Sequence, residues 1–279
     1  MPLLLTTVAM VAFAANSLLA RLALADGAMG PLAFTGVRLV AAAVVLSLLM
    51  AREGRLGRGL PGSWASALAL AGYAVAFSLA YVRLGAAIGA LILFAMVQIT
   101  MISWSLMRGE RPGLIEWLGI GAAFAGFVAL VFPRLGAPDP LAAALMTLSG
   151  LAWGIYSLRG KGEPDPIGAT AGNFLRAAPL GVAMIAAALT LETWTLLGLA
   201  AGLASGALAS GLGYVVWYRA VRGATGAQAA VVQLTAPVIA AVGATLLLGE
   251  PLTLHLVGSG ALILLGVLVA VVSPKRAAA

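Results

Sequence analysis

Long apolar stretches follow one another along the whole chain, and this pattern decides which solvent surrounds the folded protein. An α-helix needs about 20 mainly apolar residues to cross the hydrocarbon layer of a bilayer. Of all residues, 62% are hydrophobic and only 9% are charged, whereas charged residues make up about a quarter of a soluble domain. We therefore predict an all-α integral membrane protein. The ten transmembrane helices that we predict lie near residues 3–23, 32–51, 63–82, 86–107, 114–132, 139–158, 168–189, 196–218, 225–248 and 253–273.

Lys and Arg residues are unevenly distributed between the predicted spans. With the N-terminus in the cytoplasm, eleven of them lie in cytoplasmic segments and three in the opposite loops. Positive residues accumulate on the cytoplasmic side of membrane proteins. We expect a multi-pass protein of the cell (inner) membrane with both termini in the cytoplasm. The alternative, a secretory signal ending near Ala23-Leu24-Ala25, is disfavoured because the apolar run is too long and no basic residue precedes it.

The two halves of the chain share residues at an offset near 140. Each half has five predicted spans, an odd number, so the second half lies inverted in the membrane. Inverted repeats of this kind are typical of secondary transporters. We predict one membrane domain built from a first five-helix repeat, residues 1–134, and a second, inverted repeat, residues 135–279. The matching residues are Tyr81 and Tyr218, Gly89-Ala90 and Gly226-Ala227, Gly109-Glu110 and Gly249-Glu250, Gly126 and Gly266, and Pro133 and Pro274.

This pattern resembles the drug/metabolite transporter superfamily, EamA type, over essentially the whole chain. The residues that carry the resemblance are the Tyr-ending third span of each half, the Gly-Ala pair that starts the fourth, the Gly-Glu pair after it, and the glycines of the fifth span, Gly119, Gly121, Gly126, Gly258, Gly260 and Gly266. Within the superfamily the chain is most similar to the YddG-like amino acid exporters.

The resemblance implies a transporter that exports small organic metabolites, above all amino acids including aromatic ones, by alternating access, and that needs no cofactor. Pro237 in the ninth span is a candidate hinge, but the fourth span has Val97 or Gln98 at the matching place. Aromatic pockets also bind quaternary ammonium and other lipophilic cations through ring faces. Multidrug or quaternary-cation efflux is therefore the alternative function.

Polar and aromatic side chains inside the spans are candidates for substrate binding, because an unpaired polar group in hydrocarbon costs several kcal/mol. They predict a pocket with aromatic walls and a few amides and hydroxyls, which suits a small amphipathic solute. Tyr81 and Trp217 also fit a second interpretation, as anchors at the membrane surface. The candidate substrate-binding residues are Asn16, Phe77, Ser78, Tyr81, Phe94, Gln98, Trp153, Tyr156, Tyr214, Trp217, Tyr218 and Gln233.

Arg38 and Arg176 are the only full charges well inside the predicted spans. Each could attract a substrate carboxylate, or it could cap backbone carbonyls and reach toward the nearer membrane surface. All nine acidic residues lie in loops or near span ends, so no carboxylate is placed to relay protons or bind sodium at mid-membrane. We predict facilitated diffusion or exchange.

Other function classes lack the residues that they need. The chain has no cysteine, one histidine and no G-x-S-x-G motif, so neither thiol nor serine-histidine catalysis is expected. No group of metal ligands is evident, and neither a ring of charges nor a filter segment indicates an ion channel. We expect no enzyme activity, no metal and no nucleic-acid partner. The expected partners are a small-molecule substrate and the lipid bilayer, with the chain as a monomer or a homodimer.

Overall fold

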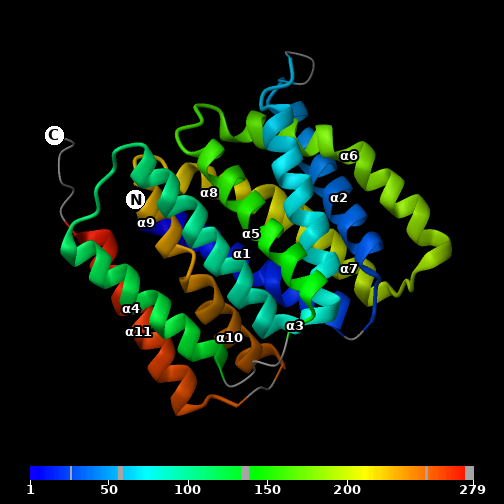
Figure 1. The fold of residues 1–279 in the computed structure, drawn as a ribbon. Coiled ribbons are helices and arrows are strands. Elements are labelled where there is room, and N and C mark those ends of the chain that lie inside the picture. The colour runs from blue at the N-terminus through cyan, green and yellow to red at the C-terminus, as the bar shows by residue number, and fades with distance from the viewer. Residues whose placement is uncertain (26, 56–58, 133–137, 249–250, 274–279) are drawn as a thin grey trace.

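The computed structural model describes residues 1–25, 27–55, 59–132, 138–248 and 251–273 (Figure 1). In these residues the secondary structure is helical, apart from an isolated bridge between Met29 and Trp194. The elements are α1 (Leu3–Ala20), η1 (Arg21–Ala25), α2 (Pro31–Arg52), α3 (Trp64–Met107), α4 (Leu114–Val131), α5 (Pro140–Gly160), α6 (Pro166–Leu191), α7 (Leu196–Ala204), η3 (Ser205–Leu212), α8 (Gly213–Ala220), α9 (Gly226–Val232), α10 (Thr235–Leu248) and α11 (Leu254–Val272).

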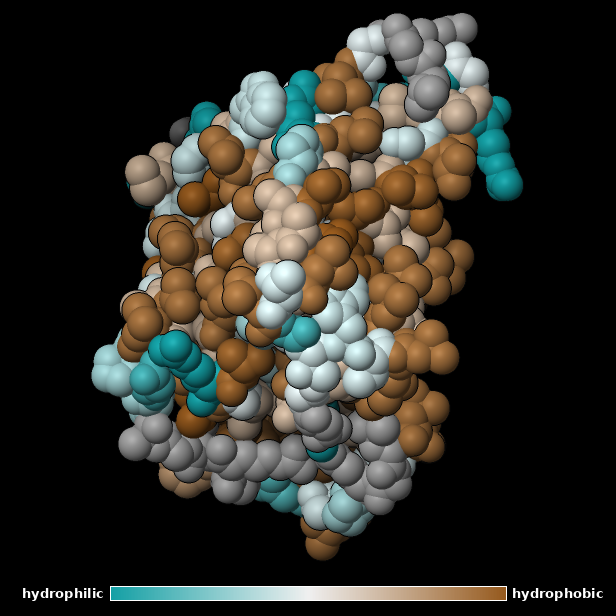
Figure 2. Space-filling model, turned by 90° about the vertical axis from the view of Figure 1, so that its right-hand side faces the viewer, coloured by the Kyte–Doolittle hydropathy of each residue, from teal (hydrophilic) through white to brown (hydrophobic). Residues whose placement is uncertain are grey.

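Nine helices in the described part of the chain are long and apolar enough to cross a membrane. α7, η3 and α8 together form one of them, Leu196–Ala220. The count differs from the ten predicted spans because the predicted spans 63–82 and 86–107 both fall in α3, Trp64–Met107. Many large hydrophobic side chains, such as Leu196 and Leu254, are exposed, and Figure 2 shows hydrophobic side chains over most of one face. Such a surface requires lipid as solvent. The chain is therefore an all-helical, multi-pass membrane protein.

The longest helix, α3, is interrupted at Gly85. A helix of 44 residues would be about 66 Å long, roughly twice the thickness of the hydrocarbon layer. Gly85 has φ 72° and ψ 173°, a backbone conformation that is essentially restricted to glycine. This residue divides α3 into a piece before it, residues 64–84, and a piece after it, residues 86–107.

The segment predicted as the ninth span is also interrupted, between α9 and α10. Pro237 has no N–H to donate to the carbonyl of Gln233, which instead accepts from the N–H of Ala236 at 3.1 Å. The preceding turn is tightened in the same way, since the N–H of Leu234 donates to the carbonyl of Val231 at 3.0 Å. Pro237 as a hinge stays a prediction.

Helices from the two halves of the chain pack closely against one another. α2 lies against α6, α4 against α11, α3 against α5, and α1 against α8 and α10 (Figure 1). Glycines permit the closest contacts, because a Cβ added at Gly36 would lie 2.6 Å from the Gly181 carbonyl oxygen. One added at Gly119 would lie 2.5 Å from the Ala270 nitrogen. Of the residues matched between the halves, Pro133, Gly249, Glu250 and Pro274 lie outside the described residues.

Two glycines of α3 provide a matched test of the interruption. A Cβ added at Gly85 or Gly72 would meet no atom within 4 Å, so only the backbone conformation distinguishes the two positions. Gly85→Ala should lower the free energy of unfolding by about 1–3 kcal/mol, whereas Gly72→Ala should leave it unchanged or raise it by up to about 1 kcal/mol. Thermal unfolding of the purified variants in detergent measures both. Equal effects at the two positions would contradict the backbone conformation of Gly85.

Candidate functional site

A cavity of about 440 Å³ lies between the last turns of α1 and η1, the region of α3 around Gly85, the end of α4, α10 and the start of α11. Its volume is in the range of pockets that hold small organic molecules. Leu, Ala, Phe and Pro side chains form most of its wall. The polar residues on the wall are Ser17, Arg21, Tyr81, Thr245, Thr253 and His255. We refer to this space as the large cavity.

A second cavity of about 40 Å³, the small cavity, adjoins the large one. Ser17, Phe77, Leu93 and Phe94 line both spaces, so the two cavities share part of their walls. The other residues of the small cavity come from α1, α3, α5, α8 and the break between α9 and α10. Both halves of the chain therefore contribute to this pair of neighbouring cavities.

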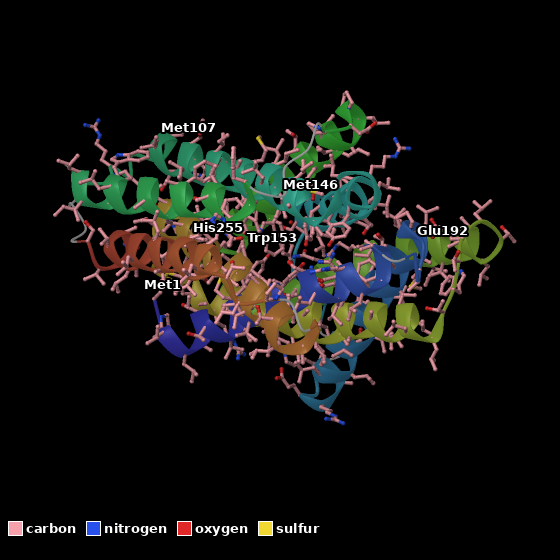
Figure 3. All side chains as sticks on the ribbon, turned by 90° about the horizontal axis from the view of Figure 1, so that it is seen from below. Met1, Met107, Met146, Trp153, Glu192 and His255 are labelled. Atoms are coloured by element: carbon pink, nitrogen blue, oxygen red, sulfur yellow. The ribbon has the colours of Figure 1, made fainter. Side chains whose placement is uncertain are left out.

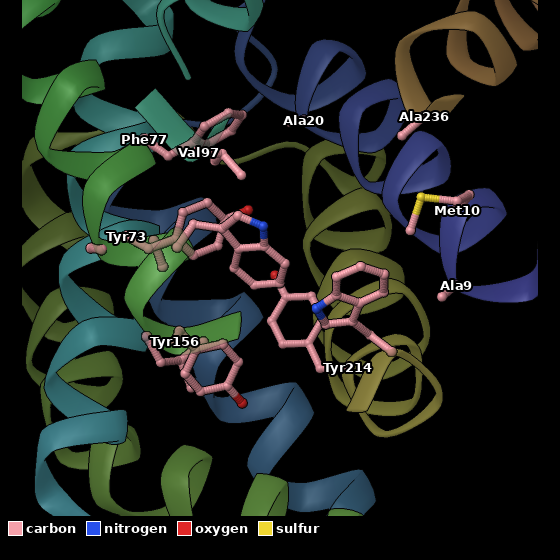
Figure 4. Close-up of a cluster of buried hydrophobic side chains, with 14 of the residues drawn as sticks. Ala9, Met10, Ala20, Tyr73, Phe77, Val97, Tyr156, Tyr214 and Ala236 are labelled. Atoms are coloured by element: carbon pink, nitrogen blue, oxygen red, sulfur yellow. The ribbon is translucent and has the colours of Figure 1, made fainter. Parts of the chain in front are cut away.

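Four aromatic residues of the small cavity, Phe13, Tyr73, Trp153 and Tyr214, form a group that we call the aromatic cluster. The Trp153 ring centroid lies 4.9 Å from that of Tyr73 and 4.7 Å from that of Tyr214. The ring centroids of Phe13 and Trp153 are 5.3 Å apart, and the two rings meet edge to face. The Trp153 Nε1–H donates to Gln233 Oε1 at 2.7 Å, which fixes the indole plane. Trp153 is labelled in Figure 3, and Tyr73 and Tyr214 are labelled in Figure 4.

The two tyrosines of the aromatic cluster meet a buried arginine on α2. Arg38 Nη2 donates to the Tyr73 hydroxyl at 3.0 Å and to the Tyr214 hydroxyl at 2.6 Å. Its Nε donates to Ser210 Oγ at 2.8 Å. Arg38 is 1% exposed and donates to no backbone carbonyl. This arrangement differs from the carbonyl cap that the sequence left open for it.

Arg176, its counterpart in the other half, has different surroundings. It donates to the carbonyls of Leu60 and Pro61, at 2.9 Å and 2.8 Å, and to that of Gly172 in its own helix at 2.9 Å. It lines neither cavity. Arg176 therefore ties α6 to the segment that precedes α3, and only Arg38 lies next to the site.

Seven of the twelve candidate residues line a cavity: Asn16, Phe77, Tyr81, Phe94, Trp153, Tyr214 and Gln233. The other five, Ser78, Gln98, Tyr156, Trp217 and Tyr218, are buried but line neither. Three of these connect helices.

Gln98 Nε2 donates to the Ala230 carbonyl at 2.8 Å. Trp217 Nε1 donates to Ser157 Oγ at 3.2 Å, and the Tyr218 hydroxyl donates to the Tyr156 carbonyl, also at 3.2 Å. Trp217 is fully buried and Tyr81 is 6% exposed, so neither lies at the outer surface of the bundle.

Sequence reasoning missed Phe13, Tyr73, Thr245 and His255 as lining residues. A signal existed for Tyr73, because it lies four residues before Phe77 and on the same helical face. His255 lies at the start of α11, and only the packing of α11 on α4 brings it to the large cavity, where its ring contacts the Ala129 carbonyl at 2.9 Å. In the described residues no group of His, Asp and Glu side chains is arranged to hold a metal ion.

Glu110 connects several segments at the end of the bundle away from the large cavity. The carboxylate of Glu110 accepts from the Gly226 N–H at 2.8 Å, from Lys161 Nζ at 2.8 Å and from the Ser105 hydroxyl. These contacts join the end of α3 to the start of α9 and to the segment after α5. Nearby, the Tyr218 ring lies directly on Gly160, where an added Cβ would come within 1.9 Å of it.

Three comparisons relate the chain to known proteins. The sequence profile of the EamA-like transporter family matches residues 1–132 and 140–272. A Pseudomonas aeruginosa protein described as "Uncharacterized protein PA1977" is 48% identical over 269 residues, which cover 94% of each chain. A solved structure described as "Crystal structure of protein" has the same fold, with a TM-score of 0.78 at 18% identity over 97% of this chain and 98% of that one.

The Glu110 contacts predict a dependence of stability on pH. Burial raises the pKa of Glu110, but the hydrogen bonds from Lys161, Ser105 and Gly226 outweigh burial and lower it overall. A carboxyl whose pKa is lower in the folded protein stabilises the fold above its unfolded pKa, about 4.3 for Glu, and this contribution is lost as the pH falls through the folded value. The melting temperature of the wild type should therefore fall more steeply below pH 5 than that of Glu110→Gln. Identical dependence of the melting temperature on pH in the two proteins would contradict a lowered pKa of Glu110.

Proposed function

Because this chain belongs to the EamA-like transporter family, and is thus a membrane transporter of small molecules, we propose that it exports small organic metabolites, foremost amino acids including aromatic ones. The proposed mechanism is alternating access by facilitated diffusion or exchange. The large cavity, which shares part of its wall with the small cavity and thus adjoins the aromatic cluster, carries this proposal. Its apolar and aromatic walls suit the body of such a solute, and its few polar groups suit the charged end.

The charges of the lining favour amino acids over quaternary cations. Among the described residues that line the two cavities there is no Asp or Glu, whereas the positively charged Arg21 lines the large one. Aromatic faces alone attract a cation, but nearby positive charge opposes it. A zwitterion or an anion is the better match.

Several observations support two inverted five-helix repeats. The family profile matches the chain in two consecutive stretches, 1–132 and 140–272. The break at Gly85 lets the two pieces of α3 cross separately, which would give ten spans. The helix contacts also follow the same pattern in both directions. The first helix of each half contacts the other half, since α1 packs on α8 and α10 and α5 packs on α3. The remaining pairs join corresponding helices of the two halves, α2 with α6 and α4 with α11.

The difference between the two ends supports alternating access. The large cavity lies at one end of the bundle, and at the other end Glu110 ties α3 to α9 through the Gly226 N–H. Tyr81 and Tyr218, which match in the two halves, have opposite surroundings, because Tyr81 lines the large cavity and Tyr218 is buried on Gly160. In a second conformation, Tyr218 would line a cavity at its own end of the bundle and Tyr81 would be packed against a neighbouring helix. With both termini cytoplasmic in the inner membrane, as the Lys and Arg distribution favours, the large cavity faces the outside.

Purified protein in liposomes tests the substrate class. We expect saturable counterflow of amino acids, no transport of lipophilic cations, and no effect of an uncoupler while the solute gradient is fixed. Trp153→Ala should reduce the transport of aromatic amino acids about tenfold, because it removes the ring at the centre of the aromatic cluster. Trp117→Ala is the matched control, since Trp117 is 41% exposed on α4. Preferential transport of the cations would contradict the proposal.

A reversible cross-link tests alternating access. A Cβ at residue 226 would lie 3.2 Å from the Ser105 Cβ, close to the spacing in disulfides, and the chain has no native cysteine. Oxidation of the double variant Ser105→Cys and Gly226→Cys should abolish transport and preserve substrate binding, and reduction should restore transport. Each single variant under oxidant is the control. Full transport by the cross-linked protein would contradict alternating access, because it would show that the end of the bundle around Glu110 does not have to open.

A further inference from the structure

Arg38 is a buried charge without a counter-charge in the described part of the chain. Its partners are the neutral hydroxyls of Tyr73, Tyr214 and Ser210, and its guanidinium lies 5.1 Å from the Tyr73 ring centroid. Nη1 is buried and has no hydrogen-bond partner. None of the ion pairs among the described residues includes Arg38. Neutral hydroxyls satisfy donors, but they do not balance the charge, and an unbalanced buried charge is costly.

The location of this charge relates it to the site. Tyr73 and Tyr214 both line the small cavity, and their hydroxyls accept from Nη2 of Arg38. The guanidinium therefore lies behind the wall of the small cavity, in direct contact with two residues that form it. A buried charge acts strongly on its surroundings because little water screens it.

We propose that this transporter selects substrates that carry a carboxylate, and that Arg38 supplies the selecting charge through Tyr73 and Tyr214. The proposal rests on the proposed function and names its substrate class. A substrate whose aromatic or apolar body lies in the large cavity, against Phe77 and Phe94, would extend its carboxylate into the small cavity toward the two phenols. The carboxylate would provide the counter-charge that Arg38 lacks among the described residues. Arg38 is a positioning residue in this scheme, since it acts through the tyrosines that it holds.

A purely structural role for Arg38 is the competing explanation. Arg38 joins α2 to α3, η3 and α8, so its loss could weaken the packing of all four. That loss would affect every ligand equally. A selecting charge, by contrast, affects ligands according to their own charge.

Three probes with the same phenyl body separate the two explanations: phenylpropionate, L-phenylalanine and phenethylammonium. Isothermal titration calorimetry of the purified protein measures their affinities without requiring transport. The wild type should bind the two carboxylate probes at least about tenfold more tightly than phenethylammonium, as expected for hydrogen bonds to a charged group. Arg38→Gln should remove this preference by weakening only the carboxylate probes, and Arg38→Lys should retain part of it.

Two further variants keep the test decisive. Tyr73→Phe combined with Tyr214→Phe preserves both rings and the charge but removes the hydroxyls, and it should reduce the preference even if Arg38→Gln does not fold. Arg176→Gln removes an equal charge away from both cavities and should keep the wild-type preference.

The proposal would be overturned if the wild type bound phenethylammonium as tightly as the carboxylate probes or more tightly, or if it bound none of the probes. An equal loss of affinity for all three probes in Arg38→Gln would also overturn it. Binding of the carboxylate probes without any transport in liposomes would instead overturn the proposed function and leave this inference standing.

Discussion

Hydrocarbon offers no hydrogen-bond partner to a polar group, and this constraint shapes the whole structure. The backbone satisfies itself within helices almost throughout the described chain, so each interruption exposes groups that need another partner. The break between the two pieces of α3 at Gly85 and the break between α9 and α10 at Gln233 both lie beside the cavities, since Ala86 and Ala87 line the large one and Gln233 lines the small one. Irregular backbone therefore occurs at the site, where polar groups can face a solute or water.

The contacts that hold the helices together are also the contacts that shape the site. Trp153 from the second half lies between Tyr73 of the first and Tyr214 of the second, and both tyrosines converge on Arg38. Any movement of one half against the other must change this arrangement. In the proposed mechanism, binding and conformational change are therefore coupled through a few side chains, and the Glu110 contacts join α3 to α9 at the opposite end.

The sequence predicted the helices well, because the length of an apolar stretch is a direct measure of what can cross a bilayer. It predicted the cavity less well. Tyr214, Trp217 and Tyr218, which share one helical face by their spacing, were all candidates for substrate binding, but only Tyr214 lines a cavity, because α5 covers the other two. Helical periodicity shows which residues share a face of a helix, but it does not show which other helix packs against that face. His255 and Thr245 could not be predicted either, since helices distant in sequence bring them to the site.

The central claim is that two halves of opposite orientation enclose one cavity, and labelling from a single side of the membrane tests it most directly. The chain has no native cysteine, so Glu110→Cys and Glu250→Cys can each be probed in intact cells with an impermeant maleimide. Residue 250 should react from outside, and residue 110 should react only after the membrane is permeabilised. Reaction of both residues from the same side would contradict the account.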